Sequence, residues 1–351
     1  MQWKVYTILK LVLSILILLV LELKVEAQQV PLSQYYVSPL NMNPALVGCS
    51  TRPFISFHHR SQWNSFSNSY PINIASIVYP IVQKYPKKTY KGGVGLQLIR
   101  EVAGMQGWLK NTGVHFAGAY NLPLDYKYKH VISLGVGAAY TQKNIQAEGL
   151  KWGSQYDQEH GYSSDITPSI SLDQTRLGYF SAEAGIVWTY NTFKNRLLSP
   201  WQAQSGISVS NINQPNVSFT NSEEVIPMLL KWYAGVSYSK NNWKLHPQTL
   251  VMWRGKSYHF NLGAYAQYRV SYSDYKGSST NLIGGLWYRW NDAIAVSGGI
   301  QHHNIQIALS MDLSSHPTID YLSTGQAWEA SVVYTILNKK QNVGRRFTPL
   351  I

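Results

Sequence analysis

Apolar and polar residues alternate regularly in the stretch from residue 281 to residue 313. In its last part the apolar side chains take every second position and the positions between them are polar or small: Ile305, Ile307, Leu309 and Met311 against Gln306, Ala308, Ser310 and Asp312. Residues 293–302 repeat the pattern, and His302, His303 and Asn304 join the two runs. A period of two predicts β-strands with one apolar face. Each run has about ten residues, the length with which a tilted strand crosses a bilayer.

The same alternation, with turn residues between the runs, predicts fourteen strands. Their expected ranges are 54–63, 69–80, 92–102, 110–121, 130–143, 178–190, 202–212, 231–240, 244–254, 258–270, 280–291, 293–302, 304–313 and 327–336. Single-chain bacterial barrels have an even number of strands, with long loops outside and short turns in the periplasm. The three longest predicted connections, 144–177, 213–230 and 314–325, all fall on one side. The fold class is therefore all-β, an antiparallel transmembrane β-barrel of about 14 strands.

The amino-acid composition is consistent with a transmembrane β-barrel. The 351 residues include 25 tyrosines, 12 tryptophans and 26 glycines, and only 13% are charged, against about 25% in soluble domains. Apart from the amino terminus there is no long apolar run, because alternation dilutes the hydropathy of barrel strands. With one cysteine the chain has no intramolecular disulfide.

Four segments are expected. Residues 1–27 resemble an export signal, with a basic start, an apolar core at 9–23 and a small-x-small site at Val25-Glu26-Ala27; a retained membrane anchor is the alternative. Residues 28–53 carry four prolines and form an arm or plug. The barrel covers 54–336, and a basic periplasmic tail covers 337–351.

The formal net charge of +13 is concentrated in predicted periplasmic turns and in the tail. A docking rim for an acidic periplasmic partner would contain Lys84, Lys87, Lys88, Lys91, Lys127, Lys129, Lys339, Lys340, Arg345 and Arg346. The alternative is that these are solvated turn residues. Nucleic acid is not expected as a partner, because an export signal is present and no binding motif is found.

Some charges fall on the predicted lumen face: Glu183, Arg269, Arg289, Asp312 and Glu329. Buried charges must pair or be hydrated. Either an internal network closes the barrel, or a wet channel runs through it. Fourteen strands leave space that the proline-rich arm could fill.

No catalytic, cofactor or metal site is expected. His58 and His59 are adjacent, as are His302 and His303, so along a strand each pair points to opposite faces and does not chelate one metal. The chain lacks a nucleophile elbow, a glycine-rich phosphate loop and a Cys-x-x-Cys motif. A Ser-His pair assembled only in space stays open as an alternative.

Several segments resemble one family. The arm contains Ser33-Gln34-Tyr35, Pro39-Leu40 and Asn43-Pro44-Ala45 followed by Gly48. Further matching segments are Arg60-Ser61-Gln62-Trp63, Gly92 to Leu96, Trp152 to Asp157, Ile307 to Asp312 and Thr324 to Ser331. Together they resemble the PorP/SprF family of type IX secretion system outer-membrane proteins. Glu101, Ser154 and Ala327-Trp328-Glu329 depart from the family's pattern.

The resemblance implies a non-enzymatic component of the type IX secretion and gliding machinery in a Gram-negative, Bacteroidetes-type outer membrane. Its expected partners are periplasmic and outer-membrane components of that machinery, outer-membrane lipid, and a secreted, adhesin-like surface protein as cargo. The alternatives are a passive channel or fatty-acid-porin-like transporter of small molecules, and a soluble periplasmic β-sandwich or lectin.

Overall fold

A computed structural model of the chain describes most of the predicted barrel and the arm before it. The described residues are 32–62, 70–83, 89–104, 107–125, 129–146, 152–157, 161–163, 165–167, 174–190, 201–220, 222–273, 278–314 and 327–336. Among them, no helix is both long enough and apolar enough to span a membrane.

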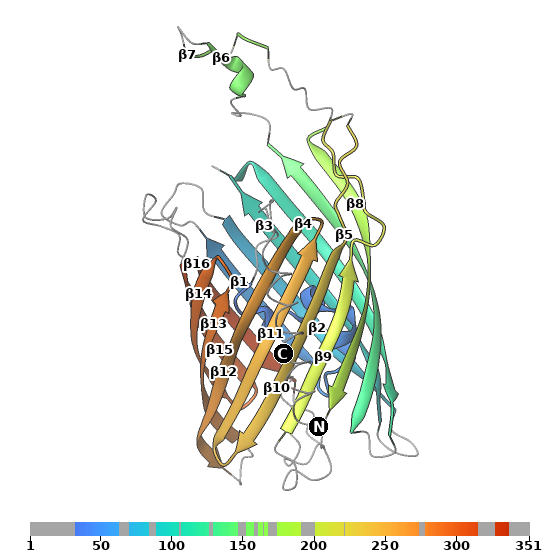
Figure 1. Cartoon of the computed structure of the whole chain (residues 1–351), viewed down its shortest axis with the longest axis vertical. Helices are drawn as coiled ribbons and strands as arrows, with labels where there is room; N and C mark the ends of the chain where they lie inside the picture. The colour runs from blue at the N-terminus through green and yellow to red at the C-terminus, as the bar shows by residue number, and fades with distance from the viewer. Residues whose placement is uncertain are drawn as a thin grey trace, which may run out of the picture.

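Fourteen strands form one closed antiparallel barrel (Figure 1). They are β1 (Phe54–Gln62), β2 (Tyr70–Gln83), β3 (Thr89–Ala103), β4 (Leu109–Pro123), β5 (His130–Ile145), β8 (Arg176–Tyr190), β9 (Trp201–Ser210), β10 (Leu229–Lys240), β11 (Trp243–Arg254), β12 (Ser257–Ser273), β13 (Ser278–Arg289), β14 (Ala293–His302), β15 (Ile305–Ser314) and β16 (Ala327–Thr335). The predicted fold class is confirmed, and no strand boundary differs from its predicted position by more than about three residues.

Each barrel strand pairs with its neighbours in sequence, and β1 pairs with β16 to close the ring. We call this β1–β16 pairing the seam. A small separate hairpin, β6 (Tyr156–Asp157) and β7 (Gly161–Tyr162), belongs to the β5–β8 connection and lies beyond one end of the barrel (Figure 1). The long connections after β5, β9 and β15 leave the same end, which is therefore the outer end.

The alternation along each strand separates an exterior from a lumen. On β15, Ile307 and Leu309 are 46% and 60% exposed, whereas Ala308, Ser310 and Asp312 are buried. Exposed aromatic side chains near strand ends, including Tyr120, Tyr140, Trp188, Tyr268, Tyr288, Trp290, Trp328 and Tyr334, add to this exterior. An apolar band with aromatic edges is the surface that a barrel presents to lipid.

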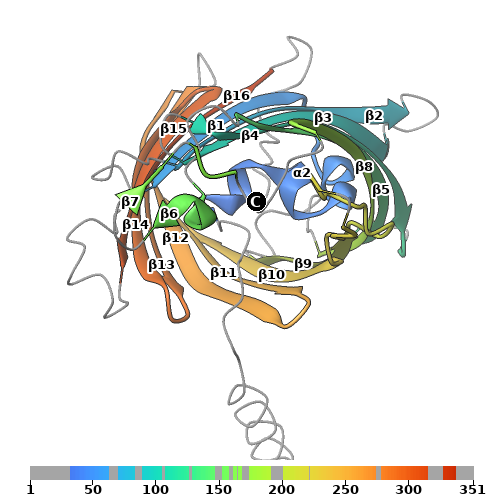
Figure 2. The same cartoon turned by 90° about the horizontal axis from the view of Figure 1, so that it is seen from above.

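Residues 32–50, which we call the arm, lie inside the barrel (Figure 2). The arm folds as three short helices, η1 (Tyr35–Val37), α2 (Pro39–Met42) and η2 (Pro44–Gly48). Pro39 and Pro44 take first helical positions, where the missing N–H costs nothing. Asn43 caps η2 through its side-chain oxygen, which accepts from the Ala45 backbone N–H at 2.9 Å.

The arm runs from the outer part of the lumen to its periplasmic end. Ser33 contacts Arg289, the last residue of β13 at the outer end, while Cys49 contacts Ser133 near the periplasmic start of β5. The chain then enters β1 at that periplasmic end. The arm therefore traverses much of the barrel's height before the wall begins.

Candidate functional site

The arm is held at its amino-terminal end by the carboxylate of Glu329, which lies on the lumen face of β16. The two carboxylate oxygens accept from consecutive backbone amides, Ser33 N–H at 2.7 Å and Gln34 N–H at 2.8 Å. Hydrogen bonds from neutral donors to a carboxylate are shorter and stronger than those between neutral groups. Glu329 is fully buried, so these bonds replace the water that the carboxylate loses.

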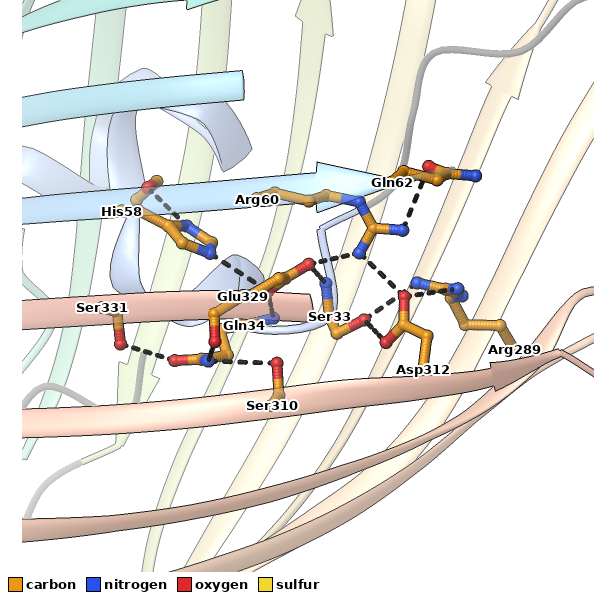
Figure 3. Close-up of polar contacts among 11 residues, drawn as sticks. Ser33, Gln34, His58, Arg60, Gln62, Arg289, Ser310, Asp312, Glu329 and Ser331 are labelled. Atoms are coloured by element: carbon orange, nitrogen blue, oxygen red, sulfur yellow. Dashed lines mark hydrogen bonds and ion pairs between the residues drawn. The ribbon is translucent and has the colours of Figure 1, made fainter. Parts of the chain in front are cut away.

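Two arginines balance the buried carboxylates around this contact (Figure 3). Arg60 Nη1 on β1 meets Glu329 and also Asp312 Oδ2 on β15, at 2.8 Å. Arg289 Nη2 on β13 meets the same Asp312 oxygen at 2.9 Å. Asp312 Oδ1 accepts from the Ser33 hydroxyl at 2.6 Å, and Arg289 Nη1 donates to that hydroxyl at 2.8 Å. We call Ser33, Gln34, Arg60, Arg289, Asp312 and Glu329 the clasp.

Both the nitrogen and the oxygen of the Gln34 side-chain amide are hydrogen-bonded to the wall. Its Nε2 donates to Ser310 Oγ on β15 at 3.0 Å, and its Oε1 accepts from Ser331 Oγ on β16 at 2.5 Å. His58 Nε2 on β1 lies 3.0 Å from Glu329 Oε2 and shares the carboxylate with the arm. The dipeptide thus bonds β15 and β16 directly, and Glu329 connects these contacts to β1 across the seam.

An aromatic slot receives the next part of the arm. The ring of Tyr36 stacks on Tyr265 of β12 and on Trp287 of β13, with centroids 5.2 and 5.6 Å away. His246 of β11 also stacks on Tyr265, with ring centroids 4.3 Å apart. Offset stacking of this kind stabilises beyond the area it buries. Trp287 and Tyr36 are both buried, so the slot belongs to the core.

The other side of the arm packs against glycines of the lumen wall. A side chain at Gly93 of β3 would collide with the backbone carbonyl of Val47, and one at Gly135 of β5 would collide with the backbone of Ala45. Only glycine allows the arm's backbone to approach the wall this closely. We call Gly93 and Gly135 the glycine seat, because the backbone of the arm packs directly on them.

Side-chain hydrogen bonds to backbone carbonyls hold the rest of the arm. Asn43 Nδ2 donates to the carbonyls of Ile186 and Ile207, at 3.2 and 3.0 Å. From the wall, Ser208 Oγ donates to Met42 O at 2.7 Å, Asn121 Nδ2 to Gly48 O at 2.8 Å, and Lys231 Nζ to Asn41 O. The arm thereby fastens β8, β9, β10 and β4 to itself.

The predicted lumen charges separate into three places. Arg289, Asp312 and Glu329 meet in the clasp, whereas Glu183 lies on β8 and its Oε2 is 3.0 Å from His115 Nε2 of β4. Arg269 is exposed near the periplasmic end of β12, away from both groups. The sequence prediction missed Arg60 and His58 as lumen residues. Both share the inward parity of β1 with buried Ser56, the criterion that selected Arg289.

The residues of the arm that resemble the family divide between these contacts. Ser33 and Gln34 belong to the clasp, Tyr35 and Leu40 are buried in apolar clusters, and Asn43 caps η2. Pro39 and Pro44 begin helices, and Ala45 and Gly48 pack against the wall at Gly135 and Asn121.

Most of the predicted basic rim lies outside the described residues: Lys84, Lys87, Lys88, Lys127, Lys339, Lys340, Arg345 and Arg346. Of the two that are described, Lys91 is in β3 near its periplasmic end. Lys129 precedes β5, and its backbone N–H donates to Asp125 Oδ1 at 2.6 Å.

Within the described part of the chain, no three His, Cys, Asp or Glu side chains are grouped to hold a metal ion. His58 faces the lumen and contacts Glu329, whereas His59 contacts Asn73 and lies against the exposed ring of Trp328, tilted by 48°. The titratable groups of the clasp are engaged in holding the arm.

The family comparison covers nearly the whole barrel and the arm. Residues 24–334 match the model of the type IX secretion system membrane protein PorP/SprF. The chain belongs to the PorP/SprF family. It is therefore a membrane component of the type IX secretion system, and its closed barrel with an apolar exterior is the form that outer-membrane proteins take. A comparison with curated proteins gives no match.

Solved outer-membrane barrels are similar to the chain at low identity. The Ralstonia pickettii toluene transporter TbuX is 11% identical with a TM-score of 0.48, covering 85% of this chain and 93% of its own. The monoaromatic hydrocarbon channel CymD is 9% identical with a TM-score of 0.49, covering 86% and 93%. A Pseudomonas aeruginosa FadL homologue is 10% identical with a TM-score of 0.41, covering 83% and 92%.

Proposed function

We propose that this PorP/SprF protein is a non-enzymatic scaffold that helps deliver or anchor a secreted surface protein, such as an adhesin. In this proposal the barrel anchors the complex in the outer membrane, the outer loops meet the cargo, and the periplasmic rim meets the secretion machinery. Maturation removes residues 1–27, and residues 337–351 add a basic periplasmic tail.

The observation that carries the proposal is the occupied lumen. The arm fills it with buried side chains, and its backbone amides, hydroxyl and carboxamide are hydrogen-bonded to three strands of the wall. A barrel whose interior is used for such contacts offers its two rims, rather than its lumen, to other molecules. The lipid-facing exterior supports anchorage.

The periplasmic rim is proposed as the docking surface for an acidic component of the machinery. Lysine and arginine outnumber acidic residues in the turns and tail on that side. Such a surface raises association rates with an acidic partner, and the effect weakens with ionic strength. The salt dependence of binding therefore separates this docking mode from an apolar one.

The test is chemical crosslinking in intact outer membranes, followed by affinity purification and mass spectrometry. We expect secretion-machine components and an exported surface protein to be recovered. A variant with Lys339, Lys340, Arg345 and Arg346 changed to glutamate should lose the periplasmic components while keeping the barrel folded. Recovery of neither class from the native protein would remove the basis for the scaffold function.

Conductance in planar bilayers tests the proposed closure separately. The purified native protein should show no steady open channel, because the arm occupies the lumen. Steady conductance would instead support the passive channel or fatty-acid-porin-like transporter. The measurement needs no partner, so it discriminates between the two functions even if the crosslinking experiment fails.

A further inference from the structure

We propose that the lumen contains a peptide-binding site, formed by Arg60, Arg289, Ser310, Asp312, Glu329 and Ser331 with the Tyr265–Trp287 slot. Its ligand class is an uncharged segment of the Ser-Gln-x-aromatic type that folds as a turn leading into one turn of 3-10 helix. The protein's own arm occupies the site within the same chain, as Ser33-Gln34-Tyr35-Tyr36.

The wall is hydrogen-bonded to both the backbone and the polar side chains of Ser33 and Gln34, as a binding site is to a peptide ligand. Glu329 accepts hydrogen bonds from two successive backbone N–H groups, so these contacts require a polypeptide. Asp312 and Arg289 are hydrogen-bonded to the hydroxyl of Ser33. Ser310 and Ser331 are hydrogen-bonded to the carboxamide of Gln34. Every polar group on the Ser33 and Gln34 side chains thus has a partner on the wall.

The charges of the site favour a neutral ligand. Two guanidinium groups already pair with two buried carboxylates among Arg60, Arg289, Asp312 and Glu329. Each of these two buried carboxylates therefore has a guanidinium partner before the arm is counted, and Arg289 Nε also pairs with the partly exposed Asp292 at 2.8 Å. A carboxylate in place of the Gln34 carboxamide would lie close to Glu329 in a buried site, where an unpaired charge is costly.

The aromatic slot sets the spacing of the ligand. Tyr36, two residues after Gln34, stacks on both Tyr265 and Trp287, with interplanar angles of 27° and 18°. Tyr35 lies between Gln34 and Tyr36 in the sequence. Its side chain is also buried and belongs to the same apolar cluster as Tyr36. The polar pair and the ring together define a short motif rather than a general affinity for peptide.

Occupancy also bears on closure of the barrel. Arg60 and Glu329 are register partners across the seam, and Gln34 contacts β15 and β16 while Glu329 contacts β1. A peptide in the site therefore bonds β15 and β16 directly and is linked to β1 through the Glu329 carboxylate that it shares with Arg60 and His58. This role goes beyond the scaffold function and does not depend on the identity of any cargo.

The test makes the arm a separate peptide without unfolding the protein first. A protease recognition sequence is inserted between Thr51 and Arg52, where the chain is half-exposed, and the folded full-length protein is cleaved there in detergent. We expect the released arm to remain bound through gel filtration and to exchange with a fluorescent synthetic peptide of residues 32–50. A peptide with Gln34→Glu should bind at least about tenfold more weakly, and a Gln34→Asn peptide should keep part of the affinity.

Two results would overturn the proposal: loss of the cleaved arm at the rate of an unbound peptide, or equal binding of the native, Gln34→Glu and scrambled peptides. If the insertion prevents folding, the full chain carrying Ser33→Ala, Gln34→Ala and Tyr36→Ala replaces it. That variant should bind the added peptide at least about tenfold better than the native chain, whose own arm competes at high effective concentration. Absence of that difference, with the barrel folded, would also overturn it.

Discussion

Arg60 on β1 and Glu329 on β16 are register partners across the seam, and their side chains form an ion pair that is 1% and 0% exposed. The same Glu329 carboxylate accepts hydrogen bonds from the backbone N–H groups of Ser33 and Gln34. Closure of the barrel and seating of the arm therefore share one carboxylate. A change at either residue is expected to affect both.

Removing the cation of this pair should destabilise the folded barrel. Arg60→Ala leaves Glu329 and Asp312 buried with one guanidinium fewer, and breaking a buried pair in this way costs about 3–5 kcal/mol. The measurement is the temperature at which the heat-modifiable band converts to the unfolded band on a gel. Arg176→Ala, at an exposed position on β8, is the matched control and should change stability by no more than about 0.5 kcal/mol. Equal conversion temperatures for the two variants would show that the pair does not support the seam.

A methyl group on the glycine seat should displace the arm and leave the wall intact. In Gly135→Ala the new Cβ collides with the Ala45 backbone, which cannot rotate away as a flexible side chain could. We expect the arm to become sensitive to protease in the folded protein, with cleavage sites mapped by mass spectrometry.

Gly284→Ala provides the control for this substitution, because a Cβ at that position on β13 meets nothing within 4 Å. Its arm should stay as resistant as in the native protein. Similar protease sensitivity in the two variants would mean that strand propensity, rather than the close approach to Ala45, causes the effect.

A disulfide should trap the periplasmic end of the arm against the wall. Cys49 Sγ lies 3.6 Å from Ser133 Oγ, so Ser133→Cys places a second thiol beside the single native one. Under mild oxidation we expect a reducible change in mobility of the denatured protein. Ser310→Cys contacts the opposite end of the arm through Gln34 and should form no bond with Cys49. Failure of Ser133→Cys alone to crosslink would contradict the placement of η2 beside β5.

The reactivity of Cys49 should report the seated arm through its pH dependence. Burial raises the pKa of the Cys49 thiol to about 11 from an ordinary value of 9.0. Because burial disfavours the thiolate, the folded protein at pH 8 should react with maleimide more slowly than the denatured protein. The raised pKa also makes the stability of the folded protein depend on pH. Between pH 9 and 11 the thiol of the unfolded chain loses its proton before that of the folded chain, so the stability that the protonated thiol contributes decreases as pH rises.

The pH dependence has a direct control. Cys49→Ser removes the ionisable group and should flatten any slope in conversion temperature that the thiol causes across this range. Labelling of the folded native protein at pH 8 as fast as that of the denatured protein would contradict a buried thiol.

The strands and their faces were predictable from the sequence because the signal is local. Ile307 and Leu309 alternate with Ala308 and Ser310, and a pleated strand converts a period of two into two faces without reference to the rest of the chain. The number of strands then determined which connections share an end. The inward parity of Asp312 and Glu329 followed in the same way, and the same alternation along β1 places Arg60 on the lumen face.

Only the tertiary structure showed what those inward charges contact. Gln34 and Ser310 are 276 residues apart in sequence, and Ser33 and Glu329 are 296 apart. No local pattern specifies such pairs, because their geometry depends on how many strands lie between them and on where the ring closes. The sequence by itself determined the wall and the proline-rich character of the arm. The closed ring decided that Glu329 meets the arm's backbone, because only closure brings β1, β16 and the arm to one place.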